Sequence, residues 1–448
     1  MGILIVRVPF PFFSILTEAS TLCKENFAKG ADKRQKVCYT ITSYMLLSLQ
    51  SKEGIPLKYW RGYIVAAIIA AITGALTAFA KTHTVLIDMF YPYTTRLIQT
   101  SLAGWASGAD FCLWQMFVVI LVALLLASIV AMILLRWNFV QWLGWVLTGA
   151  ATLFFLHTGV YGLNNYAGPL ADDIRLNVTG FNVTELAEAT TYFRDIANDL
   201  SKEVPRNNDG SVAFPSFEEM AEMAGEGFET LAYDEYVSVF AGSTIPVKKL
   251  GWADMYTSMG ITGMTMPLTG EAAVNPQIPA VTIPFVMCHE MAHRMCIATE
   301  RDANMAAFLA TDAHSDSIFR YSGYYMALRY CYSALASVGT TSADAAAQTI
   351  YNGMTAELRR DLADYDSFFN SNRNDAATDL ATNTNDLYIK ASGDEDGVGS
   401  YDQVSDLLVS WYIQEIYLPA HKEEEETFDP LDKNWVDLTT NPTVGGNE

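Results

Sequence analysis

Residues 289–293, HEMAH, and residues 299–304, TERDAN, carry the most specific pattern in this sequence. Two histidines four residues apart on a helix lie on one face, about one turn apart, so His289 and His293 can reach a single metal ion. Glu290 is turned by about 100° from His289, where it can act on a water molecule rather than bind the metal. The sequence therefore predicts a helix that carries a metal site.

The HExxH spacing is typical of zinc peptidases. A chance match on a buried helix is the alternative, but the whole chain has only six histidines. Catalytic zinc usually takes three protein ligands, so a third ligand is needed. Thr299 suits a helix N-cap, with Asp302 completing a pair that resembles a capping box, and Glu300 would then open a second helix.

Glu300 and Asp302 are both candidates for the third ligand. On a regular helix Asp302 points about 200° away from Glu300, so the two cannot serve one ion. We expect Glu300 to bind the metal and Asn304, one turn later on the same face, to steady a ligand. An ordinary solvated carboxylate is the alternative reading of Glu300.

The remaining histidines and the cysteines fit this site less well. His157 lies in an apolar run without a carboxylate, His314 fits a cap or surface role, and His421 precedes an acidic tail. A third histidine six residues after His293 is absent, because that position is Thr299. The cysteines form no CxxC pair, and we interpret those near the histidines as small core residues; the C-terminal part contains Cys288, Cys296 and Cys331.

Composition and charge limit the possible partners. The 448 residues are 51% hydrophobic, and the formal net charge is −22. Residues 1–62 hold nine Lys and Arg against four Asp and Glu, whereas residues 164–448 hold 16 against 44. Because a strongly acidic domain repels the phosphate backbone, we expect no nucleic-acid partner.

Three uncharged apolar runs predict membrane spans at about residues 63–80, 116–135 and 140–163. Runs of about 20 such residues cross the ~30 Å core of a lipid bilayer. Basic residues precede the first run and occupy the link between the second and third, where Arg136 lies. The excess of positive charge on cytoplasmic loops then predicts a multi-pass protein of the cell membrane, with a cytoplasmic segment 1–62 and an extracytoplasmic region after residue 163.

The region after the spans has the pattern of a mostly helical α+β domain, residues 164–420, followed by an acidic, disordered tail, 421–448. Helical spacing occurs at residues Thr184–Val204, Ser216–Ala232, Glu300–Ala313, Ser317–Val338, Ser342–Asn370 and Tyr401–Leu418. Residues 236–275 predict two or three short strands, the clearest at Gly260–Leu268. The predicted fold is thus a three-helix transmembrane anchor and an outer domain with a small sheet beside the HExxH helix.

Several separated blocks resemble one known family, the bacterial membrane proteins grouped as domain of unknown function 3810. The blocks are LNNYAGPLADDIRL (163–176), GITGMTMPLTGEAAVN (260–275), CHEMAHRMCIATERDANMAAFLA (288–310), FRYSGYYMALRY (319–330) and YIKASGDEDGVGSYDQVSDLL (388–408). That family in turn resembles the gluzincin-type HExxH metallopeptidases. The resemblance implies a zincin-like domain with Zn²⁺ held by His289, His293 and Glu300, and with Glu290 as base.

Two positions depart from the family pattern. Cys296 stands where the family usually has glycine, which makes a left-handed turn after the histidines harder to form. Asp302 stands where the family usually has glutamate, which favours Glu300 as the ligand.

These observations predict a membrane-anchored zinc endopeptidase, in which Glu290 activates water for attack on a peptide or protein substrate. Among Tyr321, Tyr324 and Tyr325 we expect Tyr324 to stabilise the oxyanion, although ordinary packing is the alternative for all three. By analogy with thermolysin-like folds, the strand Gly260–Leu268 would pair with an extended substrate. The alternatives are a non-catalytic receptor or scaffold with a zincin fold, and a zinc amidase acting on cell-wall peptide.

Overall fold

The computed structural model describes residues 57–234, 237–372, 374–392 and 404–421. Most of them are helical, and the chain divides into two units. The first unit ends at Ala167 and also includes Met266–Glu271, and the second holds Gly168–Thr265 and the chain from Ala272 on. The predicted cytoplasmic segment (except residues 57–62) and the predicted acidic tail (except His421) lie outside the described residues.

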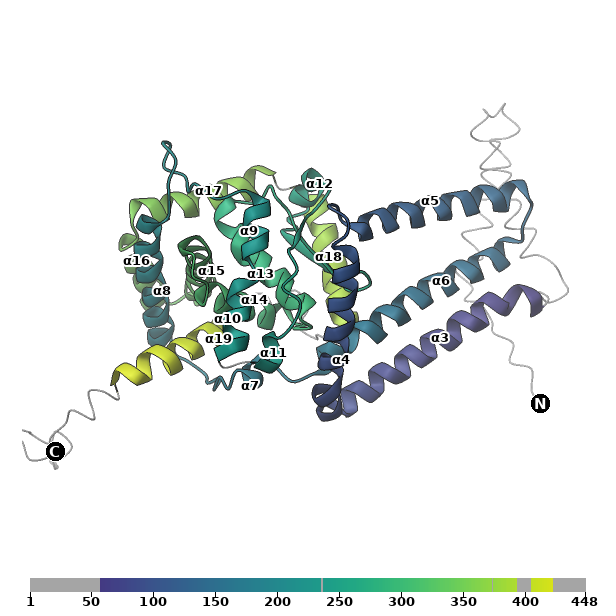
Figure 1. Cartoon of the computed structure of the whole chain (residues 1–448), viewed down its shortest axis with the longest axis horizontal. Coiled ribbons are helices and arrows are strands. Elements are labelled where there is room, and N and C mark those ends of the chain that lie inside the picture. The colour runs from purple at the N-terminus through teal and green to yellow at the C-terminus, as the bar shows by residue number, and fades with distance from the viewer. Residues whose placement is uncertain (1–56, 235–236, 373, 393–403, 422–448) are drawn as a thin grey trace, which may run out of the picture. The chain divides into compact units, whose positions relative to one another are not determined.

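The first unit contains four long helices and a short 3₁₀ helix (Figure 1): α3 (Leu57–Thr82), α4 (Thr84–Ala106), α5 (Leu113–Leu134), α6 (Phe139–Val160) and η1 (Gly162–Tyr166). In the part of the chain that the structure describes, α3, α5 and α6 are long and apolar enough to cross a membrane. They coincide with the three predicted spans, with shifted ends. Helix α4 was not predicted, because Asp88, Pro92 and Arg96 interrupt its apolar pattern.

Helices α3 and α6 pack along each other through glycines. A Cβ atom at Gly62 would lie 2.4 Å from the backbone carbonyl carbon of Gly144, so only a residue without a side chain allows this approach. The Thr148 hydroxyl donates to the carbonyl oxygen of Gly62 over 2.8 Å. Small residues and an interhelical hydrogen bond are the usual means by which helices associate in lipid.

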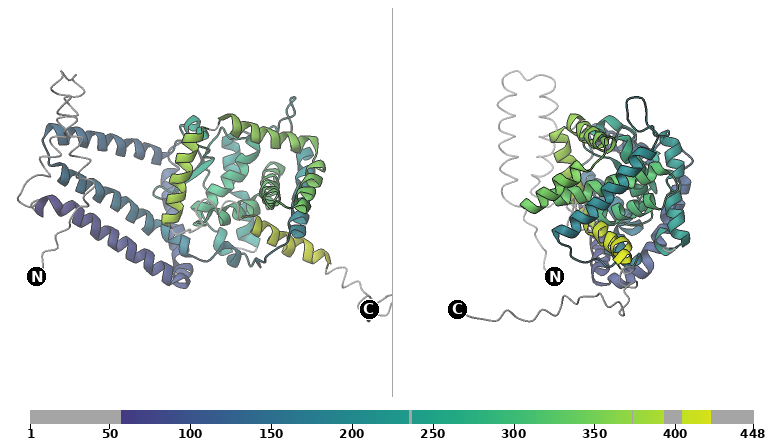
Figure 2. Two further views of the ribbon diagram at one scale, coloured as in Figure 1. Left: turned by 180° about the vertical axis from the view of Figure 1, so that it is seen from behind. Right: turned by 90° about the vertical axis from the view of Figure 1, so that its left-hand side faces the viewer.

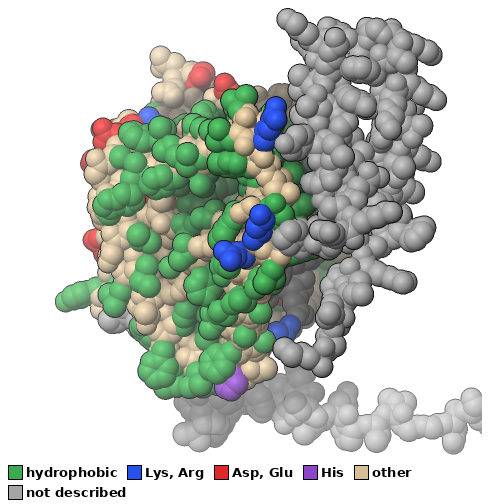
Figure 3. Space-filling model, turned by 90° about the vertical axis from the view of Figure 1, so that its right-hand side faces the viewer, with side chains coloured by type: hydrophobic (Ala, Val, Ile, Leu, Met, Phe, Trp, Pro, Cys, Tyr) green, Lys and Arg blue, Asp and Glu red, His purple; other side chains and the backbone are tan. Residues whose placement is uncertain are grey.

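The sides of these three helices expose large apolar residues. Helix α5 is the most apolar, and Ile120, Leu124 and Leu126 are all exposed along it. Figure 3 shows hydrophobic side chains spread over much of the visible face, with a few Lys and Arg side chains among them. Large apolar residues exposed along helices of this length are costly in water and typical of helices in a bilayer.

A buried carboxylate caps helix α5 within the first unit. Glu271, at the end of the segment Met266–Glu271, accepts hydrogen bonds from the N–H groups of Leu113 (2.8 Å) and Trp114 (2.9 Å). These are two of the N–H groups that lack a partner inside the helix. The negative charge is also stabilised by the dipole at the helix N-terminus.

The second unit is built around one long buried helix. Helix α15 is seen nearly end-on in Figure 1 and in the left view of Figure 2, and α8, α13, α14, α16 and α19 pack against it. The helices of this unit are α7 (Leu170–Asp173), α8 (Val183–Glu203), α9 (Phe217–Met223), α10 (Glu226–Asp234), α11 (Val237–Phe240), α12 (Ala253–Ser258), η2 (Ala280–Thr282), α13 (Ile283–Arg294), α14 (Glu300–Asp312), α15 (Ser317–Ser337), α16 (Thr341–Asn352), α17 (Ala356–Asn372), α18 (Asp375–Ser392), α19 (Val404–Trp411) and the π-helix η4 (Tyr412–Tyr417).

Helix α8 starts slightly before the predicted first residue, Thr184. The helix begins one residue before Thr184, and Asn182 is the N-cap. The Asn182 side chain accepts the N–H of Glu185, and the Glu185 carboxylate accepts the N–H of Asn182, which together form a capping box. Thr184 therefore lies inside the first turn.

Two of the predicted helices are each broken into two. The region Ser216–Ala232 forms α9 and α10 with a break at Gly225, where a Cβ atom would lie 2.7 Å from the Thr244 side chain. The region Ser342–Asn370 forms α16 and α17, and the Thr355 hydroxyl accepts the N–H of Leu358 at the start of α17 (3.2 Å). Periodicity continued through both breaks, so the sequence pattern did not show them.

The predicted short strands are present as a three-stranded sheet in the described residues. The strands β1 (Lys248–Lys249), β2 (Gly263–Met266) and β3 (Glu271–Val274) lie in the order β1-β3-β2. Strand β1 runs parallel to β3, with Lys248 opposite Ala273. Strands β2 and β3 are neighbours joined by a short turn and are therefore antiparallel. Strand β2 is half-buried at one edge, whereas β3 is buried.

Cys288, Cys296 and Cys331 in the second unit are buried, as expected for small core residues. Cys288 and Cys331 are fully inside the main hydrophobic core. Burial raises the pKa of both thiols. Cys296 has a further role in a turn, described below.

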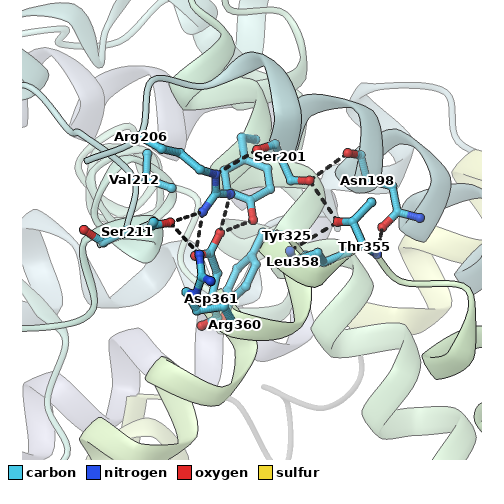
Figure 4. Close-up of polar contacts among 12 residues, drawn as sticks. Asn198, Ser201, Arg206, Ser211, Val212, Tyr325, Thr355, Leu358, Arg360 and Asp361 are labelled. Carbon is cyan, nitrogen blue, oxygen red and sulfur yellow. Dashed lines mark hydrogen bonds and ion pairs between the residues drawn. The ribbon is translucent and has the colours of Figure 1, made fainter. Parts of the chain in front are cut away.

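In the second unit an ion pair joins Arg206, just after α8, to Asp361 in α17 (Figure 4). The Arg206 guanidinium donates to both carboxylate oxygens of Asp361, over 3.1 and 2.8 Å, and to the backbone carbonyls of Ser201 (3.0 Å) and Gly210 (2.8 Å). The buried hydroxyl of Tyr321 donates to the same carboxylate. We call Arg206, Asp361 and Tyr321 the arginine–aspartate cluster.

Candidate metal centre

Helix α13 carries both histidines of the HEMAH stretch. It begins at Ile283 with Pro284 in its first turn, where a missing N–H costs nothing, and its residues are buried throughout. His289 and His293 lie one turn apart, with their rings edge to face and their centroids 4.7 Å apart. Their Nε2 atoms approach to 3.1 Å, so both imidazoles direct the same nitrogen to one point.

Glu300 reaches the same point from the next helix. The Thr299 hydroxyl accepts the N–H of Asp302 (3.2 Å) and caps α14 as predicted, which makes Glu300 the first helical residue. The Oε2 atom of Glu300 lies 3.2 Å from His289 Nε2 and 3.4 Å from His293 Nε2. The three residues form a group whose ligand atoms all lie within 4.8 Å of one another, and we call it the triad.

Asp302, the rival for the third ligand, points elsewhere. Its carboxylate accepts the N–H of Leu170 at the start of α7, over 3.1 Å. It does not belong to the group of ligand atoms formed by His289, His293 and Glu300. The geometry therefore favours Glu300 over Asp302 as the third ligand.

The turn after α13 fixes the orientation of His293. The N–H of Cys296 donates to the carbonyl oxygen of His293 (2.9 Å) and that of Ile297 to Ala292 (3.1 Å), the two hydrogen bonds of a Schellman motif. Cys296 has a φ of 71°, the left-handed conformation that glycine adopts most easily. The sequence departure at this position thus leaves the turn intact, at a cost of about 1 kcal/mol.

The same turn presents the carbonyl oxygen of Ile297 to His293 Nδ1, 2.9 Å away. When Nδ1 carries the proton and donates it to this carbonyl, the lone pair on Nε2 is free for a metal. Sequence reasoning did not find this contact, because a backbone carbonyl leaves no mark on residue identity.

The charges of the triad depend strongly on one another. Burial alone would lower the pKa of His293, but the adjacent Glu300 carboxylate raises it to about 9. Burial alone would raise the pKa of Glu300, and the attraction of the two imidazoles more than offsets this, so its pKa lies below the ordinary value. The Oε2 atom of Glu300 and the Nδ1 atom of His289 are buried without a hydrogen-bond partner. The carboxylate oxygen left in this state suits a bound cation.

Glu290 lies on the side of α13 that faces strand β2. The Thr265 hydroxyl lies 2.7 Å from Glu290 Oε2 and 2.9 Å from the Glu290 carbonyl oxygen. A Cβ atom at Gly263 would lie only 2.3 Å from Glu290 Oε1, so the glycine makes room for the carboxylate. Burial raises the pKa of Glu290. The sequence predicted a strand here but did not identify Gly263 and Thr265 as neighbours of Glu290. The Gly-x-Thr spacing within the strand was the one feature that could have indicated them.

The other residues singled out from the sequence lie in different surroundings. Asn304 is buried one turn after Glu300, and its Oδ1 accepts the hydroxyl of Tyr330 (3.2 Å), while its Nδ2 has no hydrogen-bond partner. The ring of His314 is buried, and its Nε2 contacts the carbonyl oxygen of Met223 (3.1 Å), so a surface role is wrong for it.

Tyr324 is not brought to the triad. Its hydroxyl donates to Asp312 (2.7 Å), and its ring packs among Tyr192, Phe193 and Phe308. Asp312 lies twelve residues after Glu300 on the same helix, about 18 Å along its axis. Helix α15 contains several tyrosines close together, and the sequence alone does not show which of them would lie near the triad. Tyr324 takes no part in the mechanism proposed below.

The family comparison agrees with the blocks recognised in the sequence. The model of the family described as Protein of unknown function (DUF3810) matches residues 87–409, and the chain belongs to this family. Comparisons with curated proteins and with solved structures found no match.

Proposed function

We propose, starting from membership of this uncharacterised family, that the protein is a membrane-anchored zinc endopeptidase with a gluzincin-like site. The observation that carries the proposal is the convergence of three metal-binding atoms from His289, His293 and Glu300 beside the buried carboxylate of Glu290. A structural metal site needs no base next to its ligands, whereas a hydrolytic site does.

The spacing of the triad suits zinc. In a tetrahedral site with bonds of 2.0–2.1 Å, ligand atoms lie about 3.3 Å apart. The separations within the triad are 3.1, 3.2 and 3.4 Å. Two imidazoles and one carboxylate are also the ligand set of several catalytic zinc sites, which leave a fourth position for water or substrate.

Hydrolysis would be divided between the metal and Glu290. Zinc, when bound, supplies Lewis acidity that polarises the peptide carbonyl and makes water a nucleophile near neutral pH. Glu290 accepts a proton from the attacking water at Oε1, the oxygen that faces Gly263, while Thr265 holds Oε2. The carboxyl group then gives the proton to the leaving amine.

Strand β2 would hold the substrate. It lies at the edge of the sheet, is half-buried, and contacts Glu290 through Thr265. An unpaired strand edge can add an extended peptide through backbone hydrogen bonds, and such binding selects an unfolded segment rather than a folded domain. A peptide in this position would pass next to the carboxylate of Glu290.

We also propose an orientation in the membrane. Lys58 and Arg61 lie near the start of α3, and Arg136 lies between α5 and α6, all exposed. The positive-inside tendency assigns these ends to the cytoplasm, so that the second unit, with the triad, lies outside.

The proposal is tested on the full-length protein purified in detergent. Zinc is measured by elemental analysis, and cleavage of a denatured protein is followed for the native chain, Glu290→Gln and His293→Ala. We expect bound zinc and cleavage in the native chain, zinc without cleavage in Glu290→Gln, and neither in His293→Ala. A native chain that binds no zinc would refute the proposal. Bound zinc with cleavage of cell-wall peptides alone would instead identify an amidase, and zinc without any Glu290-dependent cleavage a receptor.

A further inference from the structure

We propose that Thr265 is a positioning residue for Glu290, an inference that rests on the proposed function. Its hydroxyl holds one carboxylate oxygen and leaves the other to accept the proton from water.

The contacts of the Thr265 hydroxyl define this role. Its oxygen lies 2.7 Å from Oε2 and 2.9 Å from the backbone carbonyl oxygen of Glu290, so a single group touches both ends of the residue. Threonine is β-branched and has few χ1 rotamers available in a strand, so the hydroxyl is itself held in place. A hydrogen bond to an ionised carboxylate is among the stronger ones in proteins.

Gly263 supplies the other half of the arrangement. Residues two apart on a strand face the same side, so Gly263 and Thr265 both face Glu290. A Cβ atom at Gly263 would lie 2.3 Å from Oε1 and 2.8 Å from Cγ and Cδ of Glu290. The strand therefore offers a hydroxyl to one oxygen and, at the glycine, room for the other oxygen to pack close to the backbone, and the carboxylate has one orientation that satisfies both.

A purely structural tie between β2 and α13 is the alternative, because the contact with the backbone carbonyl could serve it alone. The two roles make different predictions. A structural tie affects the melting temperature and substrate binding, whereas a positioning residue affects kcat with little change in KM. Serine at position 265 retains the hydroxyl and would rescue a positioning role.

The test uses the zinc-loaded full-length protein in detergent and an unfolded, fluorescently labelled casein as substrate. Thr265→Val and Thr265→Ala are expected to lower kcat about 10- to 100-fold, the value of one hydrogen bond to a charged group, with KM within about twofold. Thr265→Ser is expected to recover most of the activity, and Gly263→Ala to lose it through displacement of Oε1. Zinc content should stay the same in the position-265 variants.

Acetohydroxamate binding gives a readout that does not depend on turnover. A hydroxamic acid gives up a proton to a base when it binds a metal, so we expect about tenfold weaker binding in Thr265→Val but not in Thr265→Ser. Thr190→Val is the matched control, because the buried Thr190 hydroxyl donates only to the backbone carbonyl of Leu186 in α8. It should leave kcat and hydroxamate binding unchanged.

The outcomes separate this inference from the proposed function. Native-like kcat in both Thr265→Val and Thr265→Ala, or failure of Thr265→Ser to recover a lost activity, would overturn the positioning role while leaving a zinc peptidase in place. A native chain without zinc or without cleavage would overturn both. If Thr265→Val does not fold, Thr265→Ala and Thr265→Ser carry the same comparison.

Discussion

The second unit buries two charged clusters that differ in how completely their atoms are paired. In the arginine–aspartate cluster every side-chain nitrogen of Arg206 and both carboxylate oxygens of Asp361 have a hydrogen-bond partner. In the triad two imidazole nitrogens face each other at 3.1 Å, and the Oε2 atom of Glu300 has no hydrogen bond.

The contrast separates stabilisation from function. Buried polar groups are almost always satisfied, and a fully paired cluster contributes to the uniqueness of the fold. A cluster that brings three ligand atoms to one point and leaves a carboxylate oxygen without a hydrogen bond is typical of a site that a bound ligand completes. We therefore expect changes in the two clusters to have opposite consequences for stability and for activity.

The largest expected effect is on catalysis. Glu290→Gln removes the base beside the triad and should lower kcat about 10²- to 10⁴-fold, the usual contribution of general base catalysis. Zinc content should remain that of the native chain, because Glu290 is not a ligand. Cleavage of labelled casein and elemental analysis on one preparation check both statements, and retained activity would exclude Glu290 as the base.

The next largest effect is on the arginine–aspartate cluster. Asp361→Asn leaves the guanidinium of Arg206 without its counter-charge. We expect the free energy of unfolding to fall by about 3 kcal/mol, which is the lower end of the range for a broken buried ion pair, because Arg206 is partly exposed. Glu300→Gln, measured without metal at pH 9, should cost at most about 1 kcal/mol, because His293 can release its proton at that pH whereas arginine cannot. Melting temperatures in detergent make the comparison, and equal losses would remove the distinction between the clusters.

With zinc present, Asp361→Asn, which keeps the triad, should become more stable than Glu300→Gln, which loses one of the three ligands. Binding to the folded state alone stabilises it by about 2.7 kcal/mol at a free concentration 100 times the Kd. We expect the melting temperature of the native chain and of Asp361→Asn to rise with zinc, and that of His293→Ala to stay unchanged. A rise in His293→Ala would locate the zinc elsewhere.

Zinc affinity should depend on pH through His293, whose pKa is raised to about 9. Because zinc must displace this proton, its affinity should fall about tenfold for each pH unit below 9. In the metal-free protein the sign is opposite: the raised pKa contributes stability that is complete below the ordinary value of 6.5 and is lost as the pH rises through 9. Isothermal titration between pH 6 and 9 measures the first effect, and a pH-independent affinity would contradict it.

The smallest effect concerns the turn that orients His293. Cys296→Gly relieves a left-handed conformation at φ 71° and should stabilise the protein by about 1 kcal/mol without changing zinc affinity. Cys288→Gly is the matched contrast, since Cys288 is fully buried inside α13 and its replacement should destabilise. If Cys296→Gly and Cys288→Gly both stabilise the protein, the left-handed conformation at residue 296 is not the cause of the stabilisation.

Local patterns predicted much of the fold and of the triad. Apolar runs located α3, α5 and α6, and the spacing of His289, His293 and Glu300 with the Thr299 cap placed the three side chains that the structure brings together. These features depend on residues near in sequence, so periodicity and capping suffice to find them.

Contacts between distant segments were beyond such patterns. Thr265 meets Glu290 across 25 residues, and Tyr324 turns to Asp312 because the aromatic residues of α8 and α14 surround it. Helix α4 was missed because its polar residues resemble those of a loop. In each case tertiary packing, rather than the local sequence pattern, determined the observed structure.

The measurement that tests the central claim most directly is zinc binding by equilibrium dialysis of the full-length chain, Asp361→Asn and His293→Ala. The account predicts about one zinc ion per chain in the first two and none in His293→Ala, since the triad brings three ligand atoms to one point and His293 supplies one of them. Equal zinc binding by the native chain and His293→Ala, or none in either, would contradict it.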